Sequence, residues 1–397
     1  MKLAIVSDLH IGHEKFSDDA VKQAREAMEL ASTMADAMLL PGDIFDRRSP
    51  KPEALAQAIN LFRDLSKRNW AAKVTSFSGK AHTDIPVVAI SGTHERTMEG
   101  KDNPLNLLAL AGLLIDTSEA TTIIEKDGEK VAIFGLGGLS EDRVKERLKE
   151  INPKPLPGAF NIFMFHQSVY ELLPFSDDAI RYDDLPDGFD LYVCGHIHTM
   201  IEGKVHGKKF LIPGSTVLTQ LKEGEQEQKG FIIFDTEKQT YEFKHINSRE
   251  FVHRTIHFDG AEPKDVLKRS EDEVNSILSS SKGKPIIRLS LEGTIKDGFT
   301  NLDMPIQTIT GRYSGKAMLS IDASRLVSPA VENGIADIRE NRAGSVPIKD
   351  LGMGLFISKL KELKFSDPAK ASELFEILSS SSNKEKVMKE AEEFLNL

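Results

Sequence analysis

Eight short apolar runs, spread over the first 250 residues, constrain the fold more than any other feature of this sequence. Each is four to six residues long and is bounded by Gly, Pro or polar residues, which is typical of buried strands. Amphipathic stretches that fit helices lie between several of them, at 18–36, 51–68 and 141–150. This alternation predicts an α/β domain with two packed sheets and helices outside. The runs lie at 3–7, 37–41, 87–91, 131–136, 162–165, 191–194, 210–213 and 231–234.

The character of the sequence changes twice beyond residue 250. With 397 residues the chain exceeds the usual size of a single domain, so several domains are expected. Strand-like segments at 254–260, 284–293 and 316–324, with one helix at 263–280, predict a small α+β domain. A Gly- and Pro-containing segment and then an apolar helical pattern follow. The predicted divisions are 1–250 and 251–335 for the domains, 336–348 for a linker and 349–397 for a helical tail.

Composition narrows the class of protein. Hydrophobic residues make up 40% of the chain, enough for real cores, and no apolar run approaches the length of a membrane span. Cys194 is the only cysteine, so no internal disulfide can form, which fits a reducing cytoplasm. The 51 basic and 61 acidic residues give a formal charge of −10. That charge is a mild argument against nucleic-acid binding, which a local basic patch or bound cations can reverse.

Polar clusters stand where five of the apolar runs end. In open α/β sheets, ligands bind beyond the carboxyl ends of the strands, so we expect one site that receives all five clusters. Each cluster alone has an ordinary structural explanation, such as a turn for Gly-Asp, but their shared position favours a common site. The clusters supply Asp8 and His10; Asp43 and Asp46; Thr93, His94 and Glu95; His166; and His196 and His198.

The side chains of this set are carboxylates and imidazoles, without thiolates. That mixture suits Mn²⁺, Fe²⁺ or Zn²⁺ and argues against Ca²⁺ or a cysteine-rich zinc site. There are enough groups for two ions, and Asp43 is the candidate for a carboxylate that bridges them across about 3.5–4 Å. A pair of ions makes hydroxide from water near neutral pH and clamps the oxygens of a phosphate. Phosphoester hydrolysis is therefore the first reaction to consider.

The order of these motifs resembles the calcineurin-like metallophosphoesterase family. Asp-x-His, Gly-Asp-x-x-Asp, Gly-x-His-Asp/Glu, a single His and Gly-His-x-His follow one another within residues 1–215. The segments SDLHIGHEKF, GDIFDRRSP, IPGST and KGFIIFD are similar to one branch, the archaeal break-repair nucleases of the meiotic-recombination-eleven (SbcD) type. The resemblance implies a four-layer α-β-β-α sandwich with a small α+β cap domain and a helical C-terminal tail.

The resemblance also implies roles for the motif residues around two Mn²⁺ ions. His94 becomes the residue that steadies the transition state or protonates the leaving oxygen, and we expect Glu95 to orient it. Thr93 stands where the family has Asn, so we expect a weaker second ion that is held by the hydroxyl or through a water. No motif role falls to His13, which is expected to face solvent. The first ion is assigned to Asp8, His10, Asp43 and His198, and the second to Asp43, Thr93, His166 and His196.

The activity implied by the resemblance is that of a DNA nuclease, a 3′-to-5′ exonuclease and single-strand endonuclease of double-strand break repair. It would act at the nucleoid, in the cytoplasm, with an SMC-like ABC ATPase. The family dimerises through helices of the nuclease domain, for which 51–68 and 104–113 are candidates. The candidate DNA-binding residues are Lys264, Lys268, Arg269, Lys282, Lys284, Arg288 and Arg312. The candidate ATPase-binding residues are Met353, Phe356, Ile357, Leu360, Leu363, Leu374, Phe375 and Leu378.

Two other functions stay open at this point. The superfamily motifs alone also fit a phosphodiesterase that acts on nucleotides or small phosphoesters, although such an enzyme needs no cap domain or apolar tail. The threonine at position 93 also fits a weakly active scaffold for the ATPase partner.

Overall fold

The structure, a computed structural model, describes residues 1–77, 83–96, 102–173, 178–300, 303–328, 353, 356, 357, 360 and 368–379. The chain divides into two compact units, Met1–His253 with Ser281–Ile286, and Arg254–Ser280 with Ile287–Leu397. The first unit thus includes Ser281–Ile286, a stretch that the sequence predicts for the second domain. The predicted linker at 336–348 and the tail residue Leu363 lie outside the described residues.

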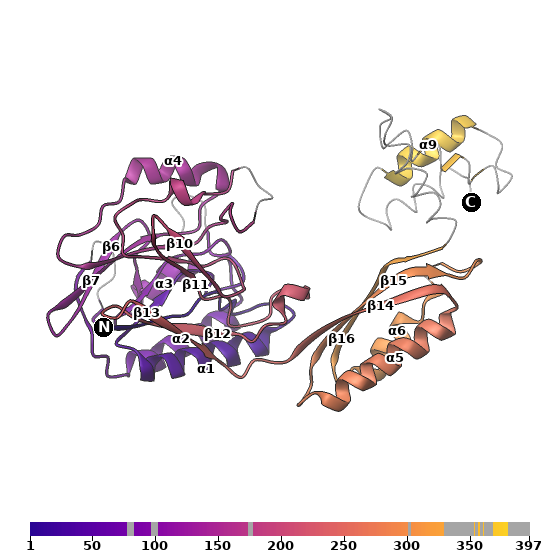
Figure 1. Ribbon diagram of the computed structural model, residues 1–397, viewed down its shortest axis with the longest axis horizontal. Coiled ribbons are helices and arrows are strands. Elements are labelled where there is room, and N and C mark those ends of the chain that lie inside the picture. The colour runs from indigo at the N-terminus through magenta and orange to yellow at the C-terminus, as the bar shows by residue number, and fades with distance from the viewer. Residues whose placement is uncertain are drawn as a thin grey trace. The chain divides into compact units, whose positions relative to one another are not determined.

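Two sheets form the centre of the first unit (Figure 1). One has six strands, in the order β13 (Thr240–His245), β12 (Gly230–Asp235), β1 (Lys2–Ile5), β2 (Ala37–Leu40), β4 (Val87–Ala89) and β5 (Ile115–Asp116). The other has seven, in the order β10 (Ile201–Val205), β11 (Lys208–Ile212), β9 (Leu191–Cys194), β8 (Phe160–Phe165), β7 (Glu129–Leu136), β6 (Thr121–Lys126) and β3 (Lys73–Phe77).

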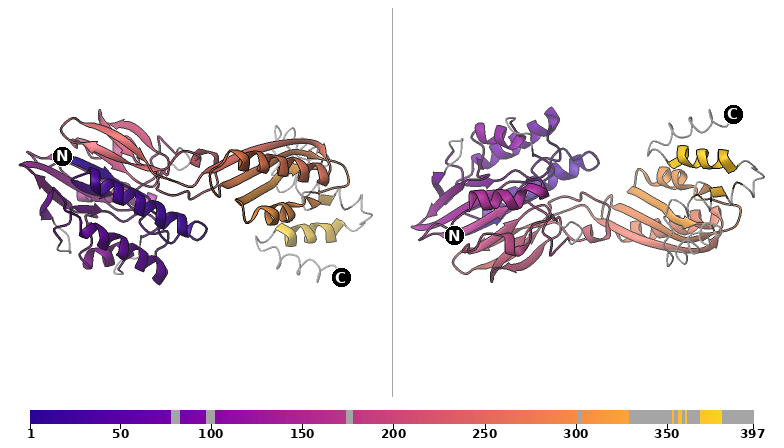
Figure 2. Two further views of the ribbon diagram at one scale, coloured as in Figure 1. Left: turned by 90° about the horizontal axis from the view of Figure 1, so that it is seen from below. Right: turned by 90° about the horizontal axis from the view of Figure 1, so that it is seen from above.

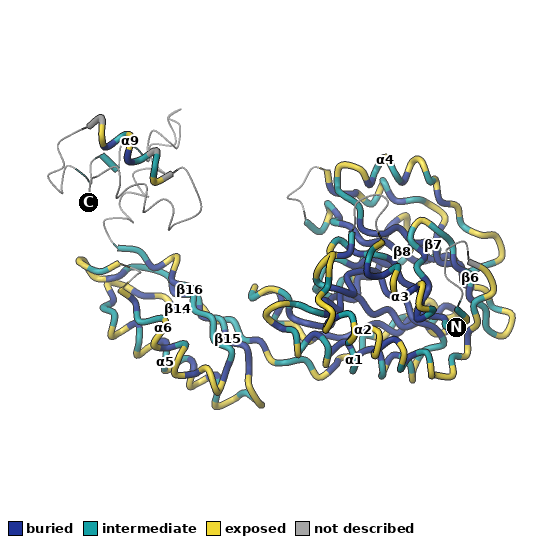
Figure 3. The backbone as a smooth tube through the Cα atoms, turned by 180° about the vertical axis from the view of Figure 1, so that it is seen from behind, coloured by how far each residue is buried: buried dark blue, intermediate teal, exposed yellow. Residues whose placement is uncertain are grey.

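Three hydrophobic clusters hold four layers together. The inner cluster joins the two sheets through side chains such as Leu39 and Met164. A second lies between the six-stranded sheet and the helices α1 (Ser17–Met34), α2 (Pro52–Ser66) and α3 (Pro104–Leu110). A third joins the seven-stranded sheet to α4 (Glu141–Ile151). Figure 3 shows the strands as the buried centre of this unit, with exposed residues on the outer helices and loops. The predicted α-β-β-α sandwich is confirmed.

All eight strands predicted for this domain are present, and so are its three predicted helices. The sequence analysis missed several strands at or near sheet edges, because their residues alternate or are largely polar. For example, β13 has no buried residue, and its pattern gives no apolar run. Prediction from apolar runs therefore finds the strands that are buried on both faces.

The second unit contains a small α+β domain with a three-stranded sheet in the order β14 (Phe251–Ala261), β15 (Ile286–Ile295) and β16 (Met318–Val327). Helix α5 (Pro263–Ser280) matches the predicted helix at 263–280. The sequence analysis did not predict a second helix, α6 (Ile306–Tyr313), in this domain. Its sequence, IQTITGRY, is rich in β-branched residues and contains glycine, both poor helix formers, so packing of Ile309 and Tyr313 decides its structure. Figure 2 shows both helices beside the sheet.

The described part of the tail is helical. Helix α9 (Pro368–Ser379) lies within the predicted tail, and the ring centroids of Phe356 and Phe375 lie 5.6 Å apart. Leu374 is buried, whereas the side chain of Leu378 is exposed. Among the residues that the structure describes, no helix combines the length and the apolar character that a membrane crossing requires.

Candidate metal centre

The five polar clusters follow strands that belong to both sheets. β1, β2 and β4 run parallel in the six-stranded sheet, and β8 and β9 run parallel in the other. Several residues just after these strands have left-handed backbones, with φ of 52° at Asp8, 46° at His10, 50° at Asp43 and 78° at His196. This region is unfavourable for most residues other than glycine, although Asp and His adopt it more readily than others, and such strained residues cluster at functional sites. The strained turns bring the side chains together.

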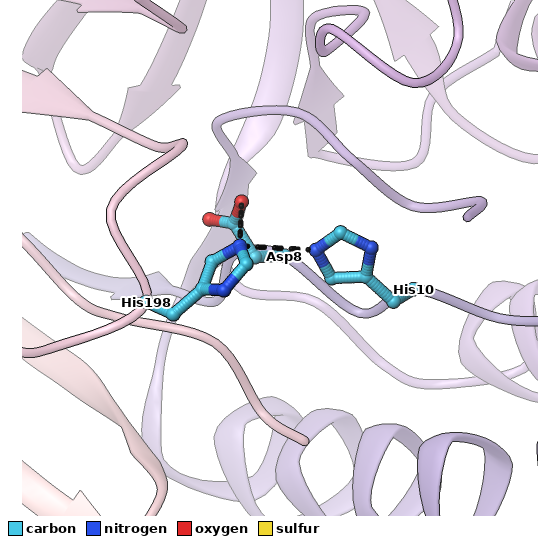
Figure 4. A group of neighbouring side chains, drawn as sticks. All are labelled: Asp8, His10 and His198. Atoms are coloured by element: carbon cyan, nitrogen blue, oxygen red, sulfur yellow. Dashed lines mark hydrogen bonds and ion pairs between the residues drawn. The ribbon is translucent and has the colours of Figure 1, made fainter. Parts of the chain in front are cut away.

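Asp8, His10 and His198 form the first group (Figure 4). Each offers one ligand atom, and these atoms lie within 4.8 Å of one another. The Nε2 atoms of His10 and His198 are 3.2 Å apart, and Nε2 of His198 is 3.8 Å from a carboxylate oxygen of Asp8. Asp8 and His10 are buried, and His198 is partly buried.

Outer hydrogen bonds fix how the two histidines of this group point. Nδ1 of His10 lies 3.0 Å from a carboxylate oxygen of Asp46, and Nδ1 of His198 lies 2.5 Å from the hydroxyl of Thr219. Because a carboxylate can only accept, Nδ1 of His10 carries the proton and its Nε2 keeps a lone pair. An imidazole whose outer nitrogen is bound to a carboxylate is the usual arrangement of a metal ligand.

The second group consists of Asp43, His166 and His196, which also lie within 4.8 Å of one another. Nδ1 of His166 donates to the carbonyl oxygen of Pro41 at 2.7 Å. Its Nε2 is buried, has no hydrogen-bond partner among the described residues, and lies 3.2 Å from a carboxylate oxygen of Asp43. A lone pair that faces a carboxylate at this distance requires a cation between them, either a proton or a metal ion. The residues therefore fit a divalent ion.

The electrostatics of this pair support the same conclusion. Burial opposes charge on both groups, but the charge of Asp43 raises the pKa of His166 to about 9. In turn, the charge of His166 holds the pKa of Asp43 well below its usual range, despite burial. Two buried groups that stabilise each other's charge in this way mark a position where positive charge is favoured.

Asp43 lies between the two groups. A third, overlapping set consists of Asp43, His10 and His94, so Asp43 is near ligand atoms of the first group as well as those of the second. One carboxylate oxygen of Asp43 accepts a hydrogen bond from the backbone N–H of His94 at 2.9 Å, which aligns the two loops. Nδ1 of His94 donates to the carbonyl oxygen of Asp46 at 2.6 Å, and its side chain is exposed.

The hydroxyl of Thr93 points to the second group. It lies 3.4 Å from Nδ1 of His196, whose Nε2 is 3.1 Å from the hydroxyl of Ser168. Burial and the neighbouring charge of His166 lower the pKa of His196 to about 4, so this imidazole is neutral at pH 7 and can act as a ligand.

Two other expectations differ from the structure. Glu95 does not use its carboxylate on His94; it accepts the backbone N–H groups of Phe45 and Gly92, at 2.9 and 2.8 Å. Burial and the charge of Asp43 raise the pKa of Glu95 to about 8. His13 is half-buried rather than solvent-facing, and its Nδ1 accepts backbone N–H groups of Lys15 and Phe16, which lead into α1. Both residues shape loops at the site.

The candidate DNA-binding residues fall into two kinds. Lys268, Lys282 and Lys284 are exposed, and no ion pair is found for them within the described part of the chain. The other four are engaged with neighbours. Lys264 pairs with Glu262, Arg288 with Asp322, Arg312 with Glu271, and Arg269 lies over the ring of Phe258.

Sequence reasoning missed the residues that support the ligands from behind. Thr219, Glu225 and Ser168 belong to no motif, and Lys229 opens the KGFIIFD segment but has no expected role there. Their contacts with the site follow only from the fold. Asp46 belongs to a motif, but its contacts with two histidines follow only from the folded loops.

The family of the chain follows from a comparison with known protein families. The family model for calcineurin-like phosphoesterases matches residues 1–200, half of the chain, and the chain belongs to this family.

Its similar proteins include break-repair proteins of archaea and eukaryotes. Mre11 of Methanopyrus kandleri is 28% identical over 277 residues, which cover 63% of this chain and 58% of that protein. MRE11 of Encephalitozoon cuniculi is 27% identical over 312 residues, which cover 72% of this chain and 54% of that protein. Mre11 of Methanocaldococcus jannaschii is 26% identical over 320 residues, which cover 76% of this chain and 80% of that protein. The chain therefore resembles Mre11-type proteins, and it spans little more than half the length of the first two.

Proposed function

We propose that this protein is a two-metal, Mn²⁺-dependent DNA nuclease of double-strand break repair, with 3′-to-5′ exonuclease and single-strand endonuclease activities. The observation that carries this proposal is the position of Asp43 between two His/Asp groups, next to the buried, unpartnered Nε2 of His166. The printed names of the similar proteins support DNA repair as the process.

In this proposal the residues of the site have separate roles in metal binding and in proton transfer. Bound Mn²⁺ ions would supply a hydroxide nucleophile and a clamp for the phosphate oxygens. The first group and Asp43 hold one ion, and the second group, with Thr93, holds the other more loosely. His94 has its Nδ1–H bound to the carbonyl of Asp46 and an exposed side chain, so its Nε2 is the nitrogen that could give a proton to the leaving oxygen.

DNA and the partner ATPase would bind outside the metal centre. Of the candidate cations, Lys268, Lys282 and Lys284 are the best placed to meet phosphates, because they are exposed and not engaged by neighbouring carboxylates within the described chain. The tail, which includes the exposed Leu378, is proposed to bind the SMC-like ABC ATPase. A chain without 349–397 should no longer co-purify with that ATPase; undiminished co-purification would refute the assignment.

A manganese titration on short, end-labelled DNA tests the proposed activity. The wild-type protein should shorten the labelled strand in proportion to bound Mn²⁺. Asp43→Ala should lose more than nine-tenths of this activity, because Asp43 offers ligand atoms near members of both groups. Cleavage of small phosphodiesters without cleavage of DNA would instead identify a nucleotide phosphodiesterase. If the protein cleaves neither substrate at any Mn²⁺ concentration but still binds the ATPase, it is a scaffold.

A further inference from the structure

A chain of three side chains stands behind His198, and two of them, Thr219 and Glu225, lie outside every motif found in the sequence. The Thr219 hydroxyl oxygen is 2.5 Å from Nδ1 of His198 and 3.0 Å from a carboxylate oxygen of Glu225. The same oxygen of Glu225 is 3.3 Å from Nδ1 of His198. The other oxygen of Glu225 accepts a hydrogen bond from the ammonium of Lys229 at 2.7 Å.

The chemistry of these groups gives the hydrogen bonds one direction. The carboxylate of Glu225 can only accept, so the hydroxyl of Thr219 donates to it. That hydroxyl then accepts from Nδ1–H of His198, at the shorter of the two distances. With its proton on Nδ1, His198 keeps a lone pair on Nε2, the nitrogen that faces His10 and Asp8.

Lys229 gives this arrangement its stability. Both Glu225 and Lys229 are buried, and an unpaired charge at either position would be costly. The ammonium of Lys229 also donates to the backbone carbonyl of His198 at 3.1 Å, so it holds the same residue by its main chain. The pair therefore fixes both the backbone and the imidazole of His198.

The two groups of the metal centre differ in the charge of the atoms that accept hydrogen bonds from their histidines. In the first group, His10 is backed by the carboxylate of Asp46, and His198 by that of Glu225 through Thr219. In the second group the backing atoms are neutral, the carbonyl of Pro41 behind His166 and the hydroxyl of Ser168 beside His196. Any hydrogen-bond acceptor behind an imidazole orients the ring and makes it a more basic ligand, and a negatively charged carboxylate does so more strongly than a neutral oxygen.

We propose that Thr219, Glu225 and Lys229 are positioning residues that hold His198 in its Nδ1–H form and make the first group the tighter of the two metal sites. This inference rests on the proposed metal centre but not on DNA cleavage. It predicts that Mn²⁺ fills the group of Asp8, His10 and His198 first. It also predicts that the order of filling depends on a threonine outside the ligand set.

Thr219 offers a matched pair of variants for the test, because it is only half-buried and its replacement leaves the ion pair intact. Thr219→Val keeps the shape but removes the hydroxyl, and Thr219→Ser keeps the hydroxyl. Calorimetric titration with Mn²⁺, without DNA, should show that Val weakens the tighter site by about 10-fold or more, whereas Ser stays within about 3-fold of wild type. Glu225→Gln should weaken the same site by about 10–100-fold.

Glu223→Gln is the control, since it removes the same charge from the same short turn, Glu223–Glu225, at an exposed position. Its Mn²⁺ affinities should equal those of the wild type. Electron paramagnetic resonance of the first Mn²⁺ bound should change in Thr219→Val and not in Thr219→Ser. Equal affinities and spectra for Val, Ser and wild type would overturn the inference. If the wild-type protein binds no Mn²⁺, both the proposed function and this inference fail. If it binds Mn²⁺ but does not cleave DNA, only the proposed function fails.

Discussion

Thr93 is the residue that we expect to weaken the second ion. Its hydroxyl points toward His196, but the side chain is shorter than that of asparagine and offers no amide oxygen. Thr93→Asn should therefore add a direct oxygen ligand and lower the Mn²⁺ concentration for half-maximal cleavage by at least about tenfold. The affinity of the tighter ion should change little. An unchanged manganese curve would make Thr93 a packing residue.

His94 is close enough to His10 and Asp43 to be either a ligand or an acid. We expect an acid, because its Nδ1 is already bound to the carbonyl of Asp46 and its side chain is exposed. His94→Ala should lower the cleavage rate by about 10²–10⁴-fold and leave Mn²⁺ binding unchanged. Calorimetry and a gel assay on one sample measure both quantities, and a parallel loss of metal would make His94 a ligand.

At the residue scale, the sequence predicts the candidate ligands but not what orients them. The inward-facing groups share a simple signal, since each follows an apolar strand by a few residues. Their outer partners carry no such signal. Glu225 lies 27 positions from His198, and its approach depends on the path of a loop and on the buried charge of Lys229. Glu95 was also misread, because its backbone partners are visible only in the folded loops.

At the scale of elements, the loops after β2 and β4 must approach each other closely. A Cβ added at Gly92 would lie 2.1 Å from a carboxylate oxygen of Asp43 and 2.3 Å from its backbone nitrogen. Gly92→Ala must therefore displace Asp43, and because small misplacements at such sites are costly we expect cleavage to fall by about 100-fold. Gly311→Ala is the control, since nothing lies within 4 Å of its added Cβ. Equal activity of the two variants would show that the loop contact is unimportant.

A helix or strand could be predicted from the sequence where its burial requires a regular pattern of apolar residues. Central strands such as β8, buried along most of its length, are continuous apolar runs and were all found. β10, at the edge of its sheet, has a mixed pattern and was missed. Helix α6 was missed because its intrinsic propensity opposes the helix that tertiary packing imposes.

At the scale of the whole molecule, exposed apolar side chains mark a candidate dimer surface. Leu110 and Leu107 on α3 are 59% and 45% exposed, and Ile59 on α2 is 37% exposed. Both helices pack on the six-stranded sheet. Replacing Leu107 and Leu110 together by Glu should convert a dimer into a monomer in light scattering, because charge cannot be buried there. Leu156→Glu, at a similarly exposed site elsewhere, should remain dimeric; a wild type that is already monomeric would contradict the proposal.

The proposed metal centre holds two ions that share Asp43. Anomalous diffraction from crystals soaked in Mn²⁺ can place each ion independently of activity. We expect two peaks about 3.5–4 Å apart, one beside Asp8, His10 and His198 and the other beside His166 and His196, with Asp43 next to both. A single peak at saturating Mn²⁺, or two peaks of which neither contacts Asp43, would contradict it.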